Sequence, residues 1–399
     1  LGLGAICRLS SGNATGALTE VIALDGSCAT LSVMGDASRI CVGDRVTLVS
    51  DTLRFKFHDG LLGGVVDGVG RPLDGDACED GVWRSALPDD AVMAMDRPVI
   101  ETQFQTGVRA IDGFLSLGQG QRIALFGPPG CGKSMLLAQI VSQCKAHVVV
   151  LALVGERGRE VQEFLQRHIP PALRDRMVLV VATSDRPALE RVYAAHVASS
   201  IAEAFRDQGK NVLLLVDSLT RVARALREIG LAAGEPAVRR GFPASVYPAL
   251  PKIIERAGRS KRGDITAVYA VLVEGDSDSD PIADEIKSLT DGHIELSRDH
   301  ATAGRFPAID VVKSLSRVMP DVVQTEHMML ANKGRALLAK YEELKLLIQI
   351  GEYQSGRDED ADEAIAKIDL LRGFIHSGNS KSNPPLAAVI SDMKKVIKA

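Results

Sequence analysis

The chain has 399 residues, which is enough for two or three domains with a sizeable core. Hydrophobic residues make up 46% of the sequence and charged residues 25%, and no apolar run is long enough to cross a bilayer. This composition indicates a soluble globular protein and excludes a membrane-spanning helix. The 47 Lys and Arg against 51 Asp and Glu leave a net charge of −4, so the overall charge gives no reason to expect a nucleic-acid partner.

Cysteine usage and the first residues bear on the compartment. The six cysteines are scattered and form no C-x-x-C pair, which favours free thiols in a reducing cytoplasm over a disulfide framework. The chain opens with Leu1-Gly-Leu-Gly, without Met or a basic region, so no signal peptide is in view and we expect that the natural start has been removed.

Residues 1–57 are predicted to form a small all-β N-terminal domain. Short Val/Ile/Leu runs alternate with turn clusters, which is typical of a small barrel or sandwich. No aromatic residue precedes Phe55, so the domain lacks the stacking platform of single-strand-binding barrels. The expected strands include Thr19–Leu24, Ala29–Met34 and Arg45–Val49.

Residues 58–325 are predicted to form an α/β nucleotide-binding domain. A Gly/Asp-rich stretch at 63–75 and a linker at 88–98 precede alternating apolar and amphipathic segments. The nearly continuous apolar runs are typical of a parallel sheet covered on both faces. The expected strands are Ile123–Phe126, Val148–Val154, Met177–Ala182, Val212–Val216, Ile265–Val273 and His293–Leu296, and the expected helices are Glu160–His168, Pro187–Phe205 and Leu219–Glu228.

Residues 326–399 are predicted to form a helical C-terminal domain. Apolar residues recur at helical spacing in Met328–Ile350, Glu363–Phe374 and Leu386–Ile397. We interpret the acidic run at 358–363 as a helix start, because acidic side chains there are favoured by the helix dipole.

The strongest chemical signal lies at residues 122–134, where an apolar strand runs into a glycine-rich turn and a helix. The turn fits the pattern G-x-x-x-x-G-K-[ST], in which backbone N–H groups surround a β-phosphate, Lys reaches the β/γ oxygens and Ser ligates Mg²⁺. The helix N-terminus adds a positive partial charge aimed at the same anion. The residues that carry the pattern are Gly127, Gly130, Gly132, Lys133 and Ser134.

Two further strands end in carboxylates. Asp217 follows an apolar strand and is the candidate for the second carboxylate on the Mg²⁺ side, since ligands sit beyond the C-terminal edge of a parallel sheet. In AAA-type ATPases the residue after this Asp is usually the catalytic Glu, whereas here it is Ser218. The general base that activates water must therefore come from another position. Glu156 follows the end of Val148–Val154, the first strand after the glycine-rich loop, and could orient and deprotonate the attacking water. Arg157 could offset γ-phosphate charge, and Glu160 could hold Mg²⁺-bound water.

Several motifs follow the glycine-rich turn, which is called a P-loop, in a fixed order and make the pattern more specific. They are Gly155-Glu-Arg-Gly-Arg-Glu160, Val181–Glu190, Val216–Arg221, Val271–Asp276 and Asp291–Arg298. Together they resemble the ATPases of type III secretion systems and flagellar export, a family similar to the catalytic subunits of rotary ATP synthases. The resemblance covers nearly the whole chain. It implies a RecA-like P-loop ATPase core with a mainly parallel sheet, a truncated N-terminal β-barrel and a C-terminal helical domain.

The resemblance also implies a homohexameric ring with ATP between neighbours and Mg²⁺ sites at Ser134 and Asp217. It places an arginine finger on the adjacent protomer, and the matching residue is Arg317. Phe306 matches a position where an aromatic side chain packs on adenine. Cys131 lies within the phosphate-binding loop, where we regard its oxidation as a liability.

The expected partners also follow from the resemblance: a central coiled-coil stalk, a stator or regulator of the ATPase, export chaperone–substrate complexes, and the export apparatus at the inner-membrane face. No nucleic acid is expected. Arg239 and Arg240 lie in a segment that approaches the central pore of similar rings, where they could contact the stalk or unfolded substrate. We interpret the basic run at 256–262 as a solvated loop.

Three alternative functions are weighed against protein export. A rotary ATP synthase catalytic subunit carries the acidic segment Asp-Glu-Leu-Ser-Glu-Glu-Asp in its C-terminal domain. This chain has Gln354-Ser-Gly-Arg-Asp-Glu-Asp there instead, which argues against that alternative. An RNA-translocating hexamer is disfavoured by the lack of early aromatic residues and of positive net charge. A non-catalytic regulatory ring subunit is disfavoured because Lys133, Glu156 and Arg317 occur in one chain.

Overall fold

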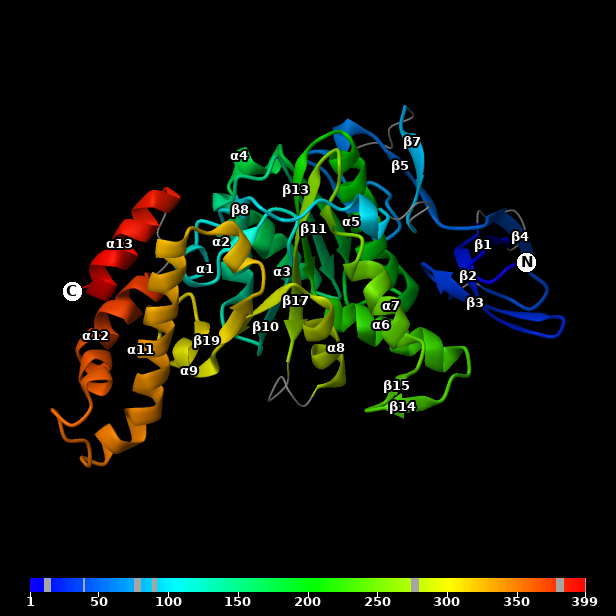
Figure 1. Cartoon of the computed structure of the whole chain (residues 1–399). Helices are drawn as coiled ribbons and strands as arrows, with labels where there is room; N and C mark the ends of the chain where they lie inside the picture. Colours follow the sequence, from blue (N-terminus) through cyan, green and yellow to red (C-terminus); the bar gives the residue numbers. More distant parts are fainter. Residues whose placement is uncertain are drawn as a thin grey trace.

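The computed structural model describes residues 1–10, 16–38, 40–74, 80–87, 92–273, 280–377 and 384–398. A central sheet with helices on both faces lies between a small N-terminal sheet and a C-terminal group of helices (Figure 1). This arrangement confirms the predicted fold class. The last part of the motif predicted at 271–276 lies outside the described residues.

The central sheet has nine strands within the described chain, in the order β19-β18-β10-β17-β13-β11-β12-β6, with β16 beside β17. Its strands are parallel except β19, which is antiparallel to β18, and β16, which is antiparallel to β17. The strands are β6 (Val65–Asp67), β10 (Arg122–Gly127), β11 (Val148–Val154), β12 (Met177–Ala182), β13 (Asn211–Asp217), β16 (Gly258–Arg259), β17 (Asp264–Leu272), β18 (Gly292–Leu296) and β19 (Ile309–Ser316). The six predicted strands are confirmed. The edge strands β6 and β19 were not predicted, because β6 has three residues and β19 is buried only at intervals.

Both faces of this sheet are buried, as the apolar strand runs predicted. In β11, alternate residues point to opposite faces, so Val150 and Leu151 belong to different hydrophobic clusters. One face packs against α5 (Ala188–Asp207), α6 (Leu219–Ala232), α7 (Val246–Ile254) and α8 (Pro281–Leu289). The other packs against α1 (Arg109–Phe114), α2 (Lys133–Gln143), α3 (Gly158–Glu163) and the following π-helical turn, η3 (Phe164–His168). The predicted helices in this region are confirmed within a few residues.

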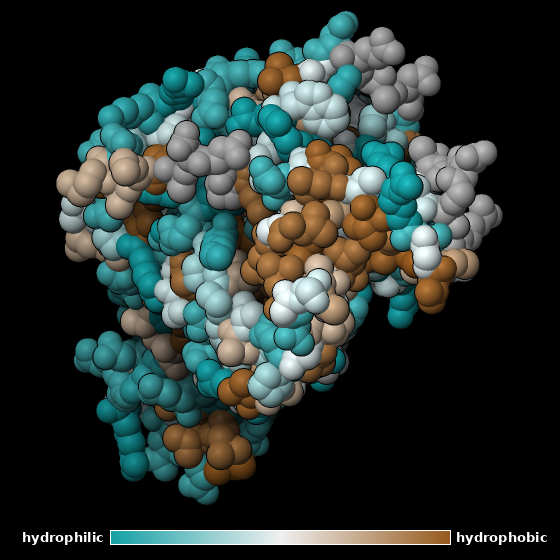
Figure 2. Space-filling view, turned by 90° about the vertical axis from the view of Figure 1, so that its right-hand side faces the viewer, coloured by the Kyte–Doolittle hydropathy of each residue, from teal (hydrophilic) through white to brown (hydrophobic). Residues whose placement is uncertain are grey.

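The predicted N-terminal barrel is represented by a four-stranded antiparallel sheet in the order β3-β2-β1-β4. Its strands are β1 (Ile6–Ser10), β2 (Leu18–Asp25), β3 (Cys28–Met34) and β4 (Arg45–Ser50), of which β1 was not predicted. Figure 2 views the molecule from this side and shows apolar residues at the surface. The large exposed apolar side chains of this sheet and the loop before β4 include Val42, Leu48 and Val49.

Short elements connect these parts. They are the ribbon of β5 (Arg54–Phe57) and β7 (Val82–Ser85), the ribbon of β8 (Gln103–Phe104) and β9 (Leu117–Gly118), the hairpin of β14 (Ala237–Arg239) and β15 (Phe242–Pro243), the 3-10 turns η1 (Asp59–Leu61) and η2 (Ala94–Asp96), and the short helices α4 (Pro171–Arg174), α9 (Arg298–Thr302) and α10 (Met319–Val322). The β14–β15 hairpin projects from the ATPase domain in Figure 1.

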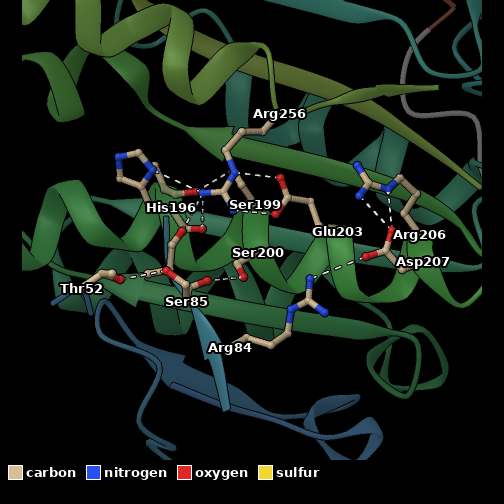
Figure 3. Close-up of polar contacts among 12 residues, drawn as sticks. Thr52, Arg84, Ser85, His196, Ser199, Ser200, Glu203, Arg206, Asp207 and Arg256 are labelled. Carbon is tan, nitrogen blue, oxygen red and sulfur yellow. Dashed lines mark hydrogen bonds and ion pairs between the residues drawn. The ribbon is translucent and has the colours of Figure 1, made fainter. Parts of the chain in front are cut away.

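Polar contacts fasten the β5–β7 ribbon to α5 (Figure 3). The Arg256 guanidinium, just after α7, donates to both carboxylate oxygens of Glu203 on α5, at 2.9 and 2.6 Å. It also donates to the carbonyl oxygen of Ala86 at 2.7 Å. The Arg256 side chain is only 4% exposed, Ala257 is buried and Gly258–Arg259 form β16, so the prediction of a solvated loop at 256–262 is wrong for its first four residues. The sequence shows the basic run but not the carboxylate that α5 brings to it.

The C-terminal domain consists of α11 (Thr325–Gln349), α12 (Glu359–Ile375) and α13 (Leu386–Lys398), as predicted. The side chain of Asp358 accepts a hydrogen bond from the backbone N–H of Ala361 at 3.1 Å, which confirms that the acidic run begins a helix. Among the described helices, none combines the length and apolar character needed to cross a membrane.

Candidate active site

Three strands of the central sheet bring the predicted residues to one edge. The P-loop follows β10, Glu156 follows β11 and Asp217 ends β13. These strands are parallel, with β17 between β10 and β13 and with β11 next to β13. Their carboxyl ends therefore open on the same side, where a doubly covered sheet binds its ligand.

The P-loop has the backbone that an anion cradle needs. Gly130 and Gly132 have φ angles of 84° and 80°, a left-handed conformation that favours glycine. A Cβ added at Gly130 would meet no atom within 4 Å, so the loop is open on that side. Helix α2 begins at Lys133 without a side-chain cap, which leaves its first N–H groups for a ligand. Ser134 is exposed at this helix start.

Lys133 and Asp217 are in direct contact across the site. Lys133 Nζ lies 2.6 Å from Asp217 Oδ1, and the two side chains are only 10% and 6% exposed. The ammonium therefore lies at the strand edge beside the glycine loop. The Asp217 carboxylate and the Ser134 hydroxyl are hard oxygen donors of the kind Mg²⁺ prefers, so the donor set present fits this cation.

Glu156 lies beside this pair and is held by Arg221, in the first turn of α6. Arg221 Nε is 3.3 Å from Glu156 Oε1. Burial, with the nearby negative charge of Asp217, raises the pKa of Glu156 to about 7, although the Arg221 and Lys133 charges oppose this shift. A carboxyl with a pKa near neutrality suits proton abstraction at physiological pH.

Arg221 was quoted within a motif but received no function from the sequence. A Cβ added at Gly155 would lie 2.7 Å from Arg221 Cδ, so Gly155 leaves room for the arginine to reach Glu156. The available signal was the position of Arg221, four residues after Asp217 in a helix that starts at the same sheet edge.

Arg157 and Glu160 lie near Glu156 but are more open to solvent. The Arg157 side chain is 75% exposed, and its Nη1 is 3.5 Å from Glu160 Oε1. The protonated Glu156 carboxyl can donate a hydrogen bond to the Glu160 carboxylate, and this contributes to the raised pKa of Glu156. Both residues therefore border the predicted γ-phosphate side of the site.

Phe306 and Cys131 differ in their relation to the loop: one packs on its backbone and the other is buried within it. A Cβ added at Gly132 would lie 3.1 Å from Phe306 Cε1, so this aromatic ring packs on the loop backbone. Cys131 is 2% exposed and belongs to the core beneath the loop, where burial raises the pKa of its thiol. Its backbone N–H can line the cradle, and its low exposure restricts the access to the thiol that the predicted oxidation would need. Gly127 ends β10 against Leu296.

Arg317 lies at the amino-terminal ends of the parallel strands, whereas its own P-loop lies at their carboxyl-terminal ends. Its backbone N–H donates to the carbonyl oxygen of Asp291 at 3.0 Å, and the Asp291 carboxylate accepts from the backbone N–H of Arg122 at 2.9 Å. Arg122 begins β10 and the P-loop follows its end, so the full strand, on the order of 20 Å, separates them. Arg317 is exposed and does not join Lys133, Glu156 and Asp217 within one chain.

Comparison with known families matches residues 107–316 to the ATP synthase alpha/beta family, nucleotide-binding domain, and residues 323–395 to the T3SS EscN ATPase C-terminal domain. The chain belongs to the type III secretion ATPase family. The C-terminal match separates this secretion ATPase from the rotary ATP synthase subunits weighed above.

Individual relatives of this secretion ATPase agree with the family. It is 46% identical to the type 3 secretion system ATPase of Pseudomonas syringae pv. tomato, over 94% of this chain and 84% of the relative. It is 49% identical to the SPI-2 type 3 secretion system ATPase of Salmonella typhimurium, over 91% and 83% of the two chains. The flagellum-specific ATP synthase of Bacillus subtilis is 42% identical, over 95% and 87%.

A solved structure covers the whole chain. The assembled ATPase EscN of the enteropathogenic E. coli type III secretion system is 45% identical and superimposes with a TM-score of 0.94, over 100% of this chain and 95% of EscN. EscN in complex with its central stalk EscO gives a TM-score of 0.90 at the same identity, over 99% and 95% of the two chains. The protein is thus an ATPase of the type III secretion class.

Proposed function

We propose that this ATPase works as a homohexameric ring in which Mg²⁺–ATP, bound between neighbours, is hydrolysed to release chaperones, unfold export substrates and feed them to the secretion channel. The observation that carries the proposal is the placement of Glu156 beside Lys133 and Asp217 at one sheet edge. The three groups supply a phosphate-binding cation, a metal-side carboxylate and a base with a pKa near neutrality.

The P-loop residues bind and orient the triphosphate. The N–H groups at the start of α2 receive the phosphate oxygens, with Gly130, Cys131 and Gly132 contributing backbone only. Lys133, now paired with Asp217, is placed to exchange that carboxylate for β- and γ-phosphate oxygens. Ser134 and Asp217 would hold Mg²⁺, which when bound would neutralise charge on those oxygens.

Glu156 orients the attacking water and accepts its proton, while Arg221 keeps the carboxylate turned toward the sheet edge. Arg157 offsets γ-phosphate charge, and Glu160 holds water on the metal side. Phe306, packed on the P-loop, forms the base-binding side of the site.

A ring is supported by the separation of Arg317 from its own P-loop. An exposed arginine at the far sheet edge serves a neighbour's site rather than its own, and such a finger offsets charge that develops in the transition state. The exposed apolar side chains of the N-terminal sheet (Figure 2) provide a second contact surface between protomers.

The stalk is proposed to contact the β14–β15 hairpin. The hairpin exposes Arg239 and Arg240 at its tip, and the related EscN is solved with its central stalk EscO. Reversing both charges should weaken binding of the cognate stalk protein, whereas unchanged stalk binding and secretion would remove this contact. The stator or regulator and the inner-membrane export apparatus are the further partners of this proposal.

The decisive experiment is Glu156→Gln in the full chain. Without the base, turnover should fall by about 10²- to 10⁴-fold, whereas ATP binding should persist because the P-loop is intact. Glu163→Gln is the matched control, since Glu163 lies on the adjoining α3 and pairs with Arg167 at 2.6 Å instead of facing the site. Near-normal turnover of Glu156→Gln would exclude Glu156 as the base.

A further inference from the structure

A side chain of the C-terminal domain contacts the residue that directly follows Phe306, the aromatic residue that packs on the P-loop. His376 follows the last turn of α12, and its Nδ1 is 2.9 Å from the carbonyl oxygen of Pro307. Pro307 belongs to the segment that connects α9 to β19 in the ATPase domain. The hydrogen bond therefore joins the two domains.

Pro307 directly follows Phe306, whose ring packs on the backbone of Gly132. Phe306 is half-buried and Pro307 is buried, so the dipeptide has the His376 imidazole on one side and the P-loop on the other. A displacement of α12 therefore acts on the position of the Phe306 ring through the His376–Pro307 hydrogen bond and the peptide bond that joins Pro307 to Phe306.

The His376 ring is fixed by more than this bond. It lies 4.9 Å from the ring of His300 on α9, measured between centroids, at an interplanar angle of 59°. Both rings line a groove of about 590 Å³ between the α9–β19 region and helices α11 and α12. Burial lowers the pKa of His376 to about 4, so the ring is neutral near pH 7 and its Nδ1–H donates to the carbonyl oxygen.

We infer that His376 is a positioning residue for the nucleotide: it holds Phe306 against the P-loop and so couples the C-terminal helices to ATP affinity. The inference rests on the proposed contact of Phe306 with the base. Loss of the hydrogen bond frees the 305–307 segment, which weakens binding without removing a group that takes part in hydrolysis.

The chain contains a matched control for a merely structural bond. His327 on α11 also places an imidazole nitrogen, Nε2, 2.8 Å from a backbone carbonyl oxygen of the ATPase domain, that of Gly113 on α1. This contact joins the same two domains but does not lead to the P-loop. Any effect of domain attachment alone should appear equally in His327 and His376 variants.

The test measures kcat, KM for ATP, ADP affinity and thermal unfolding for His376→Ala, His376→Asn and His327→Ala in the full chain. His376→Ala should raise KM and weaken ADP binding about fivefold with kcat nearly unchanged, the effect of one hydrogen bond. His376→Asn, whose amide N–H can replace Nδ1–H, should restore affinity. His327→Ala should lower the unfolding temperature and leave KM unchanged. An unchanged KM in His376→Ala, or an equal rise in His327→Ala, would overturn the inference.

Phe306→Ala separates failure of the inference from failure of the proposed site. It should raise KM by itself, and addition of His376→Ala should then cause no further rise, because both changes act through one ring. If Phe306→Ala leaves KM unchanged, the proposed contact of Phe306 with the adenine of ATP fails. If Phe306→Ala raises KM and the second change adds its full effect, His376 does not act through Phe306.

Discussion

At the scale of single residues, the site depends on how burial and neighbouring charges set the ionisation of Glu156. Its side chain is 16% exposed, and Asp217 adds a like charge nearby, so both effects disfavour the carboxylate. Arg221 and Lys133 favour it. The pKa of about 7 is the balance of these effects, and a change in any of them should move the ionisation of the base.

The first prediction concerns the pH dependence of kcat/KM. Protonation removes the base, so kcat/KM should fall on acidification through about pH 7, with up to a tenfold loss per pH unit below it. Arg221→Gln removes the cation that favours the carboxylate and should move this limb to higher pH. Because ATP ionises identically for both proteins, the displacement between their profiles isolates Glu156. Superimposable profiles would contradict the assignment.

The same scale shows what the sequence could predict about the site. Lys133, Ser134 and Asp217 follow from a motif and from strand ends, because parallel strands bring their carboxyl ends together. The contact of Arg221 with Glu156 could not be predicted, since it depends on how the start of α6 packs over Gly155.

At the scale of elements, α5 connects the central sheet to the N-terminal ribbon. One side of α5 packs in the core, and the other presents Glu203 to Arg256 and the Ser200 hydroxyl to the carbonyl oxygen of Ser85, at 2.8 Å (Figure 3). His196 lies beside Arg256 and is neutral, because burial lowers its pKa to about 3. The network places one charged pair in the interior with most of its hydrogen-bonding groups occupied.

The second prediction follows from this buried pair. Arg256→Met leaves the Glu203 carboxylate, in a side chain 12% exposed, without its cation and should lower the free energy of unfolding by about 3–5 kcal/mol. Arg262→Met, in the same basic run but exposed, should change it by less than about 0.5 kcal/mol. Denaturant unfolding of the two variants measures both values. Equal, small effects would show that the pair does not stabilise the fold.

Elements with a continuous or amphipathic pattern could be predicted, and those defined by pairing could not. The run Val148–Val154 is buried on both faces and matches β11 residue for residue. By contrast, β19 exposes Val312, Lys313 and Leu315 at the sheet edge, so its pattern is neither continuous nor strictly alternating. Its place in the sheet comes from pairing with β18.

At the scale of the whole molecule, the proposed function places two halves of different sites on one chain. The P-loop edge holds Lys133, Glu156 and Asp217, and the opposite edge of the same sheet exposes Arg317. The topology separates them, because β19 runs antiparallel to β18 and returns the chain to the start of β10. If Arg317 acts as proposed, a complete site requires a second protomer.

The last prediction tests this arrangement with mixed rings. Arg317→Ala should lower turnover by about 10³- to 10⁵-fold at concentrations where the wild type is fully active, because no neighbour then supplies the finger. Mixing it with Glu156→Gln should restore activity, since a site with an intact base then faces a neighbour with an intact arginine. Activity should be highest near equal amounts and vanish at either extreme. The control is Arg317→Ala mixed with the Arg317→Ala/Glu156→Gln double variant, which supplies no arginine and should stay inactive. Recovery in that control, or none in the first mixture, would exclude a finger in trans.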